Sequence, residues 1–479
     1  MTRAGAALAG VWTRVGPRFL PFADAATPEL PIGRLLRLSL FQVSVGMAAV
    51  LLIGTLNRVM IVELDVPAGL VAAMVALPLG FAPLRALIGF RSDTHRSVLG
   101  WRRVPYIWFG SLTQFGGLAI MPFALIILSG DSNGPAWAGH AAAALAFLLV
   151  GAGMHMVQTV GLALAADLAP ARSLARVVAL LTAMFLLGML VAGLAFGALL
   201  APFSQLRLIQ VIQGAAVLTM ALNILALWKQ EPRDPARTRG RGDSPGFVES
   251  WRLLSGSGPW GRRLVVIALG TAGFAMQDVL LEPYGGQVLG LGVAATTTLT
   301  ALLALGGIIG LVLAARALGG GWDAHRVAGA GVLLGAFAFA AIIFAAPLDS
   351  PALFGCGAML IGFGAGLFAH ATLTACMGAA PPGQVGLALG AWGATQASAA
   401  GLGVAVGGLL RDGVGALALT GRLGEALAST ATGYGTVYLV EIALLFATLA
   451  AMGPLVQAAR EDPSGLPSRL GLAGTPTGT

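Results

Sequence analysis

The sequence predicts an all-α polytopic membrane protein, with about twelve transmembrane helices in two pseudo-symmetric six-helix halves. Three observations predict this class. The composition is 57% hydrophobic and 10% charged, with a mean hydropathy of +0.86, whereas soluble domains carry about 25% charged residues. The apolar residues gather in runs of about 20, the length that spans ~30 Å of hydrocarbon. A short polar pattern also occurs twice, once in each half of the chain.

The repeated pattern has the form G-x-x-x-D-x-H-R. It reads GFRSDTHR at residues 89–96 and GGGWDAHR at residues 319–326, each time between two apolar runs. Such a repeat indicates an internal duplication, and two unrelated cytoplasmic turns are the alternative. We expect each Asp to anchor a helix end through a nearby Arg or a helix N-terminus. The repeated positions are Gly89, Asp93, His95 and Arg96 in the first copy and Gly319, Asp323, His325 and Arg326 in the second.

The apolar runs and the polar stretches between them divide the chain in order. Residues 1–34 form a basic cytoplasmic tail, and the Pro- and Arg-rich residues 229–263 form a flexible cytoplasmic linker. The first half covers residues 35–228, the second covers residues 264–458, and a cytoplasmic tail covers residues 459–479. The expected spans lie near residues 35–57, 67–90, 104–128, 139–165, 174–200, 206–228, 264–284, 293–316, 327–347, 352–377, 385–410 and 434–458.

The charges of the loops predict the orientation of these spans. With both termini in the cytoplasm, the outer loops hold only Arg58, Arg207, Arg411 and Arg422 among 28 basic residues. This asymmetry agrees with the positive-inside rule and places both tails and the linker in the cytoplasm. Because the basic residues lie in loops between apolar runs, they predict contact with the lipid bilayer and not with nucleic acid.

The sequence holds no pattern that indicates catalysis. Cys356 and Cys376 fall in one apolar run, which predicts buried thiols and no disulfide. The chain has no CxxC motif, no His/Cys cluster with zinc spacing, no P-loop and no nucleophile elbow. We therefore do not expect an enzyme, catalytic residues or a metal site of the protein's own.

Polar residues inside the spans are candidate functional residues, because lipid makes them costly. Asp278 and Glu282 are four residues apart in the seventh span and face one side of a helix. Arg58 lies at a similar height in the first span, so we expect a polar network near the outer face. The network is either functional or a structural gate that pins the two spans together. Its expected members are Asn57, Arg58, Glu63, Gln277, Asp278 and Glu282.

The repeated loop resembles the signature of major facilitator transporters, in which G-x-x-x-D and basic residues lie between the second and third helices. Two features depart from the usual pattern. A His lies two positions after each Asp, and Arg102 and Arg103 come late in the first loop. The resemblance implies a major facilitator-like fold, in which the first, fourth, seventh and tenth helices line a central cavity.

Three further stretches resemble the PucC/LhaA family, also called the bacteriochlorophyll delivery family. They are LNRVMIVEL at residues 56–64, GWRRVPYIWFG at 100–110 and QDVLLEPYGG at 277–286. The resemblance covers nearly the whole chain, and the last stretch is its most specific part. It implies an assembly factor for light-harvesting antennae in the inner membrane of phototrophic bacteria. The long basic N-terminal tail favours the LhaA type, which serves the core light-harvesting 1 antenna, over the PucC type and the peripheral light-harvesting 2 antenna.

The same resemblance implies cargo and partners. The cargo would be bacteriochlorophyll, with carotenoid or lipid as further candidates. The partners would be the light-harvesting antenna polypeptides, together with bacteriochlorophyll synthase and the protein translocation machinery. The protein would deliver pigment to these polypeptides, chaperone them, or do both.

Two histidines are candidate ligands for such a pigment. His155 and His370 lie in the fourth and tenth spans, each with Gly neighbours that would let a flat ring approach. A neutral imidazole is a good axial ligand for the magnesium of a chlorophyll, and Gln158 could instead hold a ligating water. The alternative is that each His makes an ordinary hydrogen bond between helices.

Three functions are consistent with the sequence. The first is an assembly factor that delivers pigment. The second is a proton-coupled transporter of small solutes, in which Asp278 and Glu282 are the coupling acids. The third is a pigment-free membrane chaperone. Glu441 is a further acid that could carry a proton.

Overall fold

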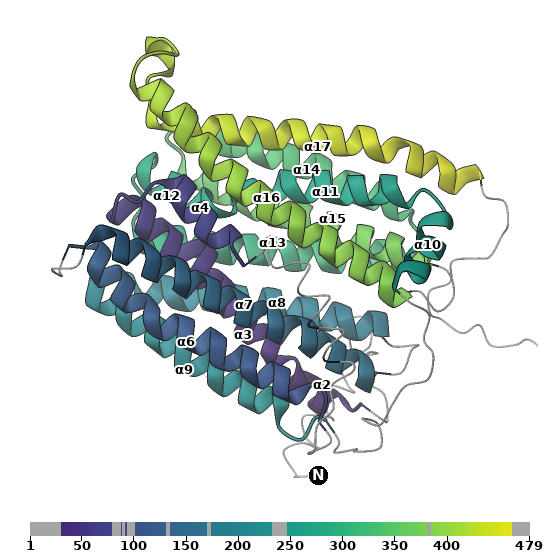
Figure 1. The fold of residues 1–479 in the computed structure, drawn as a ribbon. Helices are drawn as coiled ribbons and strands as arrows, with labels where there is room; N and C mark the ends of the chain where they lie inside the picture. The colour runs from purple at the N-terminus through teal and green to yellow at the C-terminus, as the bar shows by residue number, and fades with distance from the viewer. Residues whose placement is uncertain are drawn as a thin grey trace, which may run out of the picture.

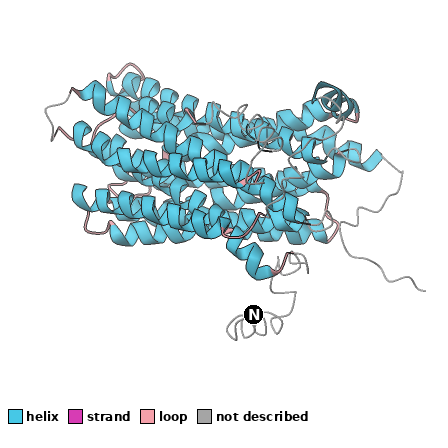
Figure 2. Ribbon diagram, turned by 60° about the horizontal axis from the view of Figure 1, so that its bottom comes forward, coloured by secondary structure: helices cyan, strands magenta, loops and turns pink. Residues whose placement is uncertain are grey.

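The computed structural model is helical throughout the residues that it describes, which are 30–78, 88, 92, 101–130, 135–169, 174–231, 247–380 and 385–461. Long helices run side by side, and Figure 2 shows no strand in these residues. Within them, eleven helical segments are long and apolar enough to cross a membrane. This confirms the predicted all-α polytopic class. The second expected span, at residues 67–90, is described continuously only as far as residue 78.

The first group of helices begins with one long span. Four consecutive helical segments form one continuous span of 32 residues, Ile32–Glu63. A turn at Pro67 leads into the second span. The helices of this group are apolar on all sides, as expected where a helix faces both lipid and other helices. Their bounds are α2 (Ile32–Leu38), α3 (Leu40–Ala49), η2 (Val50–Leu56), η3 (Val59–Glu63), α4 (Ala68–Ala76), α6 (Val104–Leu128), α7 (Ala136–Leu168), α8 (Leu174–Leu199) and α9 (Gln205–Leu227).

The second group begins with α10, which lies inside the stretch expected to be a flexible linker. This part is helical because its apolar residues can pack: Leu254 is buried in a small cluster with Trp260 and Cys376. The last two spans also extend beyond the expected residues 385–410 and 434–458. The bounds are α10 (Phe247–Gly256), α11 (Trp260–Ala275), η7 (Met276–Val279), α12 (Leu281–Gln287), α13 (Val293–Gly319), α14 (Ala324–Ala345), α15 (Pro351–Ala379), α16 (Val385–Leu419), η8 (Glu425–Leu427) and α17 (Thr430–Glu461).

The two groups lie one above the other in Figure 1, with the purple to teal helices below and the teal to yellow helices above. They pack together where α8 meets α13 and where α4 meets α16. Small residues line both contacts. A Cβ atom on Gly193 would lie 2.9 Å from the Cβ of Ala301, and one on Gly408 would lie 3.2 Å from the Cα of Gly69. Both contacts lie toward the end of the bundle opposite α10, which we call the far end; the other is the linker end.

Glycines also bring helices together inside the second group. On α14, a Cβ atom on Gly331 would lie 2.6 Å from the carbonyl oxygen of Gly364 on α15. A side chain cannot fit there without moving one helix. The high glycine content of the chain therefore serves, at such positions, the close backbone approach that stabilises helix pairs in lipid.

Polar contacts join three spans of the first group at the linker end. Arg34 donates to the side-chain oxygen of Gln230 at 3.1 Å and to its carbonyl at 2.6 Å, and the Gln230 amide donates back to the Arg34 carbonyl at 3.2 Å. The carboxylate of Glu231 accepts the backbone N–H groups of Arg102, Arg103 and Val104 at 2.8 to 3.1 Å. It thus satisfies the free donors at the start of α6. We call these contacts the linker-end clasp.

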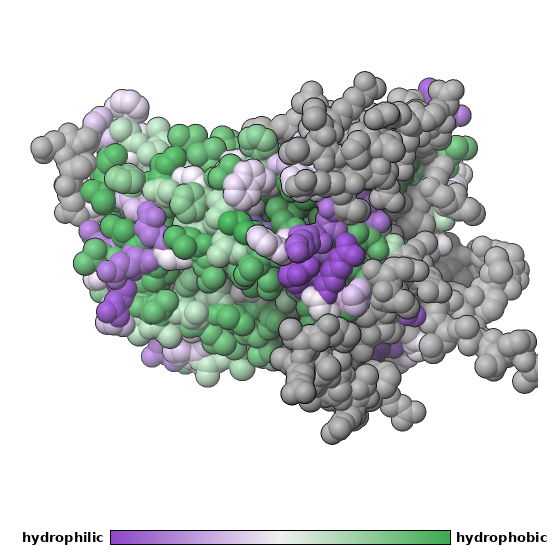
Figure 3. Space-filling view, turned by 90° about the horizontal axis from the view of Figure 1, so that it is seen from below, coloured by the Kyte–Doolittle hydropathy of each residue, from purple (hydrophilic) through white to green (hydrophobic). Residues whose placement is uncertain are grey.

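The surface of the first group is apolar where it is described. Figure 3 views the face where α6 and α9 lie and shows mainly hydrophobic residues, with polar residues toward its two ends. Phe123, Leu206 and Val217 are 63 to 66% exposed. A groove of about 500 Å³ opens between α3, α8 and α9, and Arg207 and Gln210 are the only polar side chains among its described lining residues. Such a surface is expected to face lipid.

The contact between α14 and α15 allows a test of the packing. We expect Gly331→Ala to destabilise the protein by about 1–3 kcal/mol, because the methyl group meets backbone and forces the helices apart. Gly329→Ala is the matched control, since its nearest neighbour would be a Leu449 methyl at an ordinary 3.7 Å. The melting temperature of each purified variant measures the difference. Equal melting temperatures would contradict the close approach.

Candidate functional site: the interrupted seventh span

The seventh span is interrupted about two-thirds of the way along its length. The α-helix α11 ends at Ala275, the next four residues form the 3-10 turn η7, and the α-helix α12 starts at Leu281. Pro283 lies in the first turn of α12, where its missing N–H is tolerated. The expected span ends at residue 284, just after this proline, but the observed one continues to Gln287 because the helix restarts before the proline.

The interruption frees a backbone donor that a distant carboxylate accepts. The N–H of Gln277 leaves the α-helical pattern and donates to Glu441 Oε1 on α17, at 2.7 Å. The side-chain amide of Gln277 donates to Asp278 Oδ1 at 2.6 Å. Gln277 therefore contacts two carboxylates at once. Glu441 is fully buried and Gln277 is 2% exposed, whereas Asp278 is half-buried.

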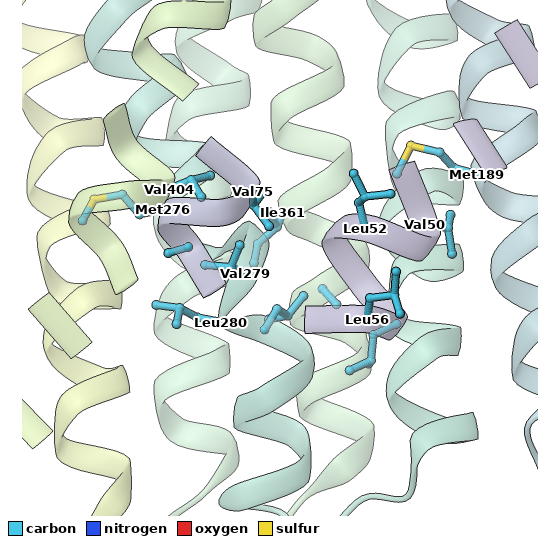
Figure 4. Close-up of a cluster of buried hydrophobic side chains, with 14 of the residues drawn as sticks. Val50, Leu52, Leu56, Val75, Met189, Met276, Val279, Leu280, Ile361 and Val404 are labelled. Atoms are coloured by element: carbon cyan, nitrogen blue, oxygen red, sulfur yellow. The ribbon is translucent and has the colours of Figure 1, made fainter. Parts of the chain in front are cut away.

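The first span is irregular at the same level. Its η2 and η3 segments are π-helical, a form that often marks functional sites. Asn57 lies between them and donates to the carbonyl of Asp278 at 3.4 Å, and the Thr55 and Thr297 hydroxyls are also 3.4 Å apart. Figure 4 shows side chains of both irregular segments, such as Leu56 and Val279, in one buried hydrophobic cluster. The two interruptions thus face each other across the two groups of helices.

Arg58 is buried but does not pair with the carboxylates of the seventh span. One guanidinium nitrogen pairs with Glu63 on its own span, and another donates to the carbonyl of Leu291 at 3.1 Å. Gly286 makes room for this side chain, because a Cβ atom there would lie 3.1 Å from the guanidinium. We expected Arg58, Asp278 and Glu282 in one polar network; the described contacts show no direct pairing of Arg58 with either carboxylate, although its charge acts on Glu282. A partner five residues away on the same span satisfies the charge instead.

Glu282 is buried between the first, seventh and eighth spans. Its Oε1 accepts a hydrogen bond from the Thr300 hydroxyl on α13, and within the described residues its Oε2 has no partner. Gly54 on η2 faces the same place, since a Cβ atom there would lie 2.9 Å from the Thr300 hydroxyl. The carboxyl group therefore occupies space that a larger residue on the first span would fill.

Aromatic packing holds α12 beside this site. The ring of Tyr284 lies 5.4 Å from those of Phe354 and Tyr434 and 5.5 Å from that of Tyr438. Its hydroxyl donates to the carbonyl of Ile342 at 3.3 Å. Such ring pairs contribute about 0.5–1.5 kcal/mol each beyond the area they bury. They attach the short α12 to α15 and α17.

A second set of polar contacts closes the far end. Gln287 accepts hydrogen bonds from Arg411 at 2.5 Å and from Tyr434 at 2.7 Å, and donates to the carbonyl of Ile61 at 3.4 Å. Asp412 accepts the backbone N–H of Gly69 at 2.5 Å. The eleventh span is therefore joined to the second, and the seventh to the first. We expected Arg411 in an outer loop, but α16 continues through it to Leu419.

The comparisons with known proteins agree with the quoted sequence stretches. A family model described as PUCC protein matches residues 55–460. The chain belongs to the PUCC family. "Protein PucC" of Rhodovulum sulfidophilum is 61% identical over 84% of this chain and 89% of its own length. An uncharacterized protein of the puhA–bchM intergenic region of Rhodobacter capsulatus is 55% identical over 96% of this chain and 97% of its own length.

A more distant relative and the solved structures widen this comparison. The "Bacteriochlorophyll synthase 44.5 kDa chain" of Rhodobacter capsulatus is 30% identical over 89% of this chain and 96% of its own length. A bacterial homologue of the lysosomal transporter Spinster, inward-facing and unoccupied, has a TM-score of 0.62 at 16% identity, over 88% of this chain and 95% of its own. PepTSo, a transporter of the POT family, also has a TM-score of 0.62. It is 14% identical, and the match covers 90% of this chain and 99% of PepTSo. These likenesses show a transporter-like fold.

The structure gives physical roles to the most specific stretches of this PUCC-family protein. In QDVLLEPYGG, Gln277 contacts two carboxylates, Pro283 opens a helix and Gly286 admits a guanidinium, as described above. In GWRRVPYIWFG, Arg102 and Arg103 each contact Asp167 at 3.1 Å, at the end of α7. The stretch therefore joins the third span to the fourth at the linker end.

The remaining candidate residues lie apart from the interruption. Asp323 caps α14 by accepting the backbone N–H of Arg326 at 2.9 Å, and Gly319 is the last residue of α13. His155, on α7, has a polar or ring contact of its own, as does Gln158. His370, on α15, is half-buried. Gly89, Asp93 and Arg96, in the first copy of the repeated loop, lie outside the described residues.

Sequence reasoning did not assign Glu441 or Thr300 to the network. Glu441, the lone carboxylate of the expected twelfth span, is predicted from the sequence only as a further acid that could carry a proton, and not as a contact of the seventh span. Thr300 carries no comparable signal, because threonines recur along the eighth span. Its role depends on lying opposite Glu282.

The Glu282–Thr300 hydrogen bond can be tested by a double substitution. We expect Thr300→Val to destabilise the protein by about 1–3 kcal/mol, because it leaves a buried carboxyl group without its donor. Replacing both partners, as Thr300→Val with Glu282→Leu, should restore most of the lost stability, since no polar group is then left unpaired. Melting temperatures of the single and double variants measure this. A double variant no more stable than Thr300→Val would argue against the contact.

Proposed function

We propose that this protein assists the assembly of bacterial light-harvesting antennae, by holding bacteriochlorophyll and delivering it to the antenna polypeptides. The observation that carries the proposal is the PUCC match over residues 55–460, which covers nearly all the spans. The relative named as a bacteriochlorophyll synthase chain supports an association with the pigment pathway. In this proposal the protein is not an enzyme, and its cargo passes through unchanged.

The proposed setting is the bacterial inner membrane, with both termini and the linker in the cytoplasm. The loop charges support this orientation. Bacteriochlorophyll synthase and the protein translocation machinery are the proposed neighbours, because new pigment and new polypeptide would meet at this protein. We propose that the protein serves light-harvesting 1 rather than light-harvesting 2, and the basic tail at residues 1–34 supports this choice.

His370 is the better of the two candidate pigment ligands. It lies in an apolar span, and no hydrogen bond to its ring is found among the described residues. His155 already has a contact of its own. Gly366, one turn before His370, packs against the carbonyl of Gly307, so it serves helix packing and leaves less room for a ring than the sequence predicts.

Bound pigment tests the proposal. We expect the purified wild type to carry bacteriochlorophyll, and His370→Ala to carry much less, because its magnesium loses an axial ligand. His140→Ala, which removes an imidazole elsewhere on α7, is the matched control and should carry the wild-type amount. Absorbance of extracted pigment per mole of protein measures each. A wild type purified from phototrophic cells without pigment would contradict delivery.

The groove between α3, α8 and α9 is the alternative site for the same cargo. Gly214 lines it, and a Cβ atom there would meet no atom within 4 Å. Gly214→Phe should therefore fill the groove without disturbing the fold. If it lowers bound pigment while His370→Ala does not, the groove holds the cargo and His370 does not. Whole-cell absorbance of a strain that lacks the gene then decides which antenna is lost.

A further inference from the structure

The carboxyl group of Glu441 is buried without a counter-charge. The residue is fully buried in the middle of α17, where its neighbours one turn away include Leu445. Its Oε1 accepts the backbone N–H of Gln277, and its Oε2 has no partner among the described residues. The described groups that act on its charge are Gln277 and Asp278, and neither is a cation. Arg58, the buried arginine of the expected network, is paired with Glu63.

A second carboxylate, that of Asp278, accepts a hydrogen bond from the same glutamine. The Gln277 amide donates to Asp278 at 2.6 Å, and Asp278 lies within electrostatic range of Glu441. A fully buried carboxylate without a cation is costly, and a second negative charge beside it raises that cost. Binding one proton removes this repulsion. Glu282 is a separate case, because its carboxyl is held by Thr300 and not by the glutamine.

Two further buried polar atoms near Glu441 have no hydrogen-bond partner among the described residues. The Gln277 Oε1 atom belongs to the amide that contacts Asp278, and it has no partner among the described residues. The Tyr438 hydroxyl, also fully buried and without a described partner, lies one helical turn before Glu441 and within its electrostatic range. A proton on Glu441 Oε2 would turn that oxygen into a donor. Neither group is hydrogen-bonded to Glu441 Oε2 in the described contacts, so the region around that oxygen holds several buried polar atoms without partners.

We propose that Glu441 and Asp278, joined by Gln277, form a proton-binding site at the interruption of the seventh span. A proton from water binds a carboxylate oxygen to give a carboxylic acid, and it leaves by the reverse step, with no change in oxidation state. The site goes beyond the proposed role in antenna assembly and does not depend on it. Proton binding would change the hydrogen bond between Gln277 and Glu441, which joins the seventh span to the twelfth.

The described surroundings contain few other titratable groups. Those near this level are Asp278 on η7, Glu282 and Tyr284 on α12, Tyr434 and Tyr438 on α17, and Arg58 on the first span. On α16, Arg411 is held by Asp412 and Gln287. Arg262, Arg263, His325 and Arg326 lie at the linker ends of α11 and α14.

Carbodiimide labelling tests the site on the full chain. Dicyclohexylcarbodiimide reacts with protonated carboxyl groups in apolar surroundings, and peptide mass spectrometry identifies the modified residue. We expect the adduct on Glu441 to form in the purified wild type and to decline through a midpoint as the pH is raised. Glu441→Gln removes the adduct, and its melting temperature shows whether the variant is folded.

The Asp278→Asn variant distinguishes a paired site from a lone acid. Removing the neighbouring negative charge makes it easier to ionise Glu441, so the labelling midpoint should move to lower pH. Glu282→Gln is the matched control, because it removes a nearby acid that Gln277 does not contact, and its midpoint should stay at the wild-type value. Absence of Glu441 labelling at every pH overturns the proposal. So does a midpoint that Asp278→Asn leaves unchanged. The experiment uses neither pigment nor antenna, so its failure would leave the proposed function standing.

Discussion

The hydrogen bond from the Gln277 backbone to Glu441 is the interaction on which the site depends. Inside a bilayer each backbone polar group needs a partner within the protein. An interrupted helix leaves such groups free, and the cost of an unpaired one is several kcal/mol. Glu441 supplies the acceptor from another span, at 2.7 Å. The 3-10 turn is therefore tolerated only because a carboxyl group reaches it from α17.

The interruption in turn places the groups that follow it. Because the helix restarts at Leu281, Glu282 is directed to Thr300 and Tyr284 enters the aromatic cluster. Gly286 then lies where the guanidinium of Arg58 needs space. These residues belong to one short stretch, yet their partners lie on five other spans. The stretch thus connects the seventh span to several others through side-chain packing and hydrogen bonds.

The membrane class and most of the spans could be predicted from the sequence, because so many apolar runs of about 20 residues are not expected in a soluble protein. The irregular segments could not. Both interrupted spans have a high mean hydropathy along their length, so hydropathy does not distinguish π-helical or 3-10 turns from α-helix. Asp278 and Glu282 could be recognised as candidates by their cost in lipid. The contacts around them could not, since tertiary packing sets Thr300 opposite Glu282 and Glu441 opposite the backbone of Gln277, and Arg58 pairs with a carboxylate on its own span.

The linker-end clasp has a consequence for how the chain is made. The free N–H groups at the start of α6 are satisfied by Glu231, and Arg34 is held by Gln230. Both acceptors come from the end of the first group, over 125 residues after the α6 donors in one case and 196 after Arg34 in the other. During synthesis, the first and third spans enter the membrane long before these partners exist. The first group can therefore complete its packing only after the ribosome has passed residue 231, so a fragment cut at the last apolar residue of α9 would lack the contacts that join its own beginning to its end.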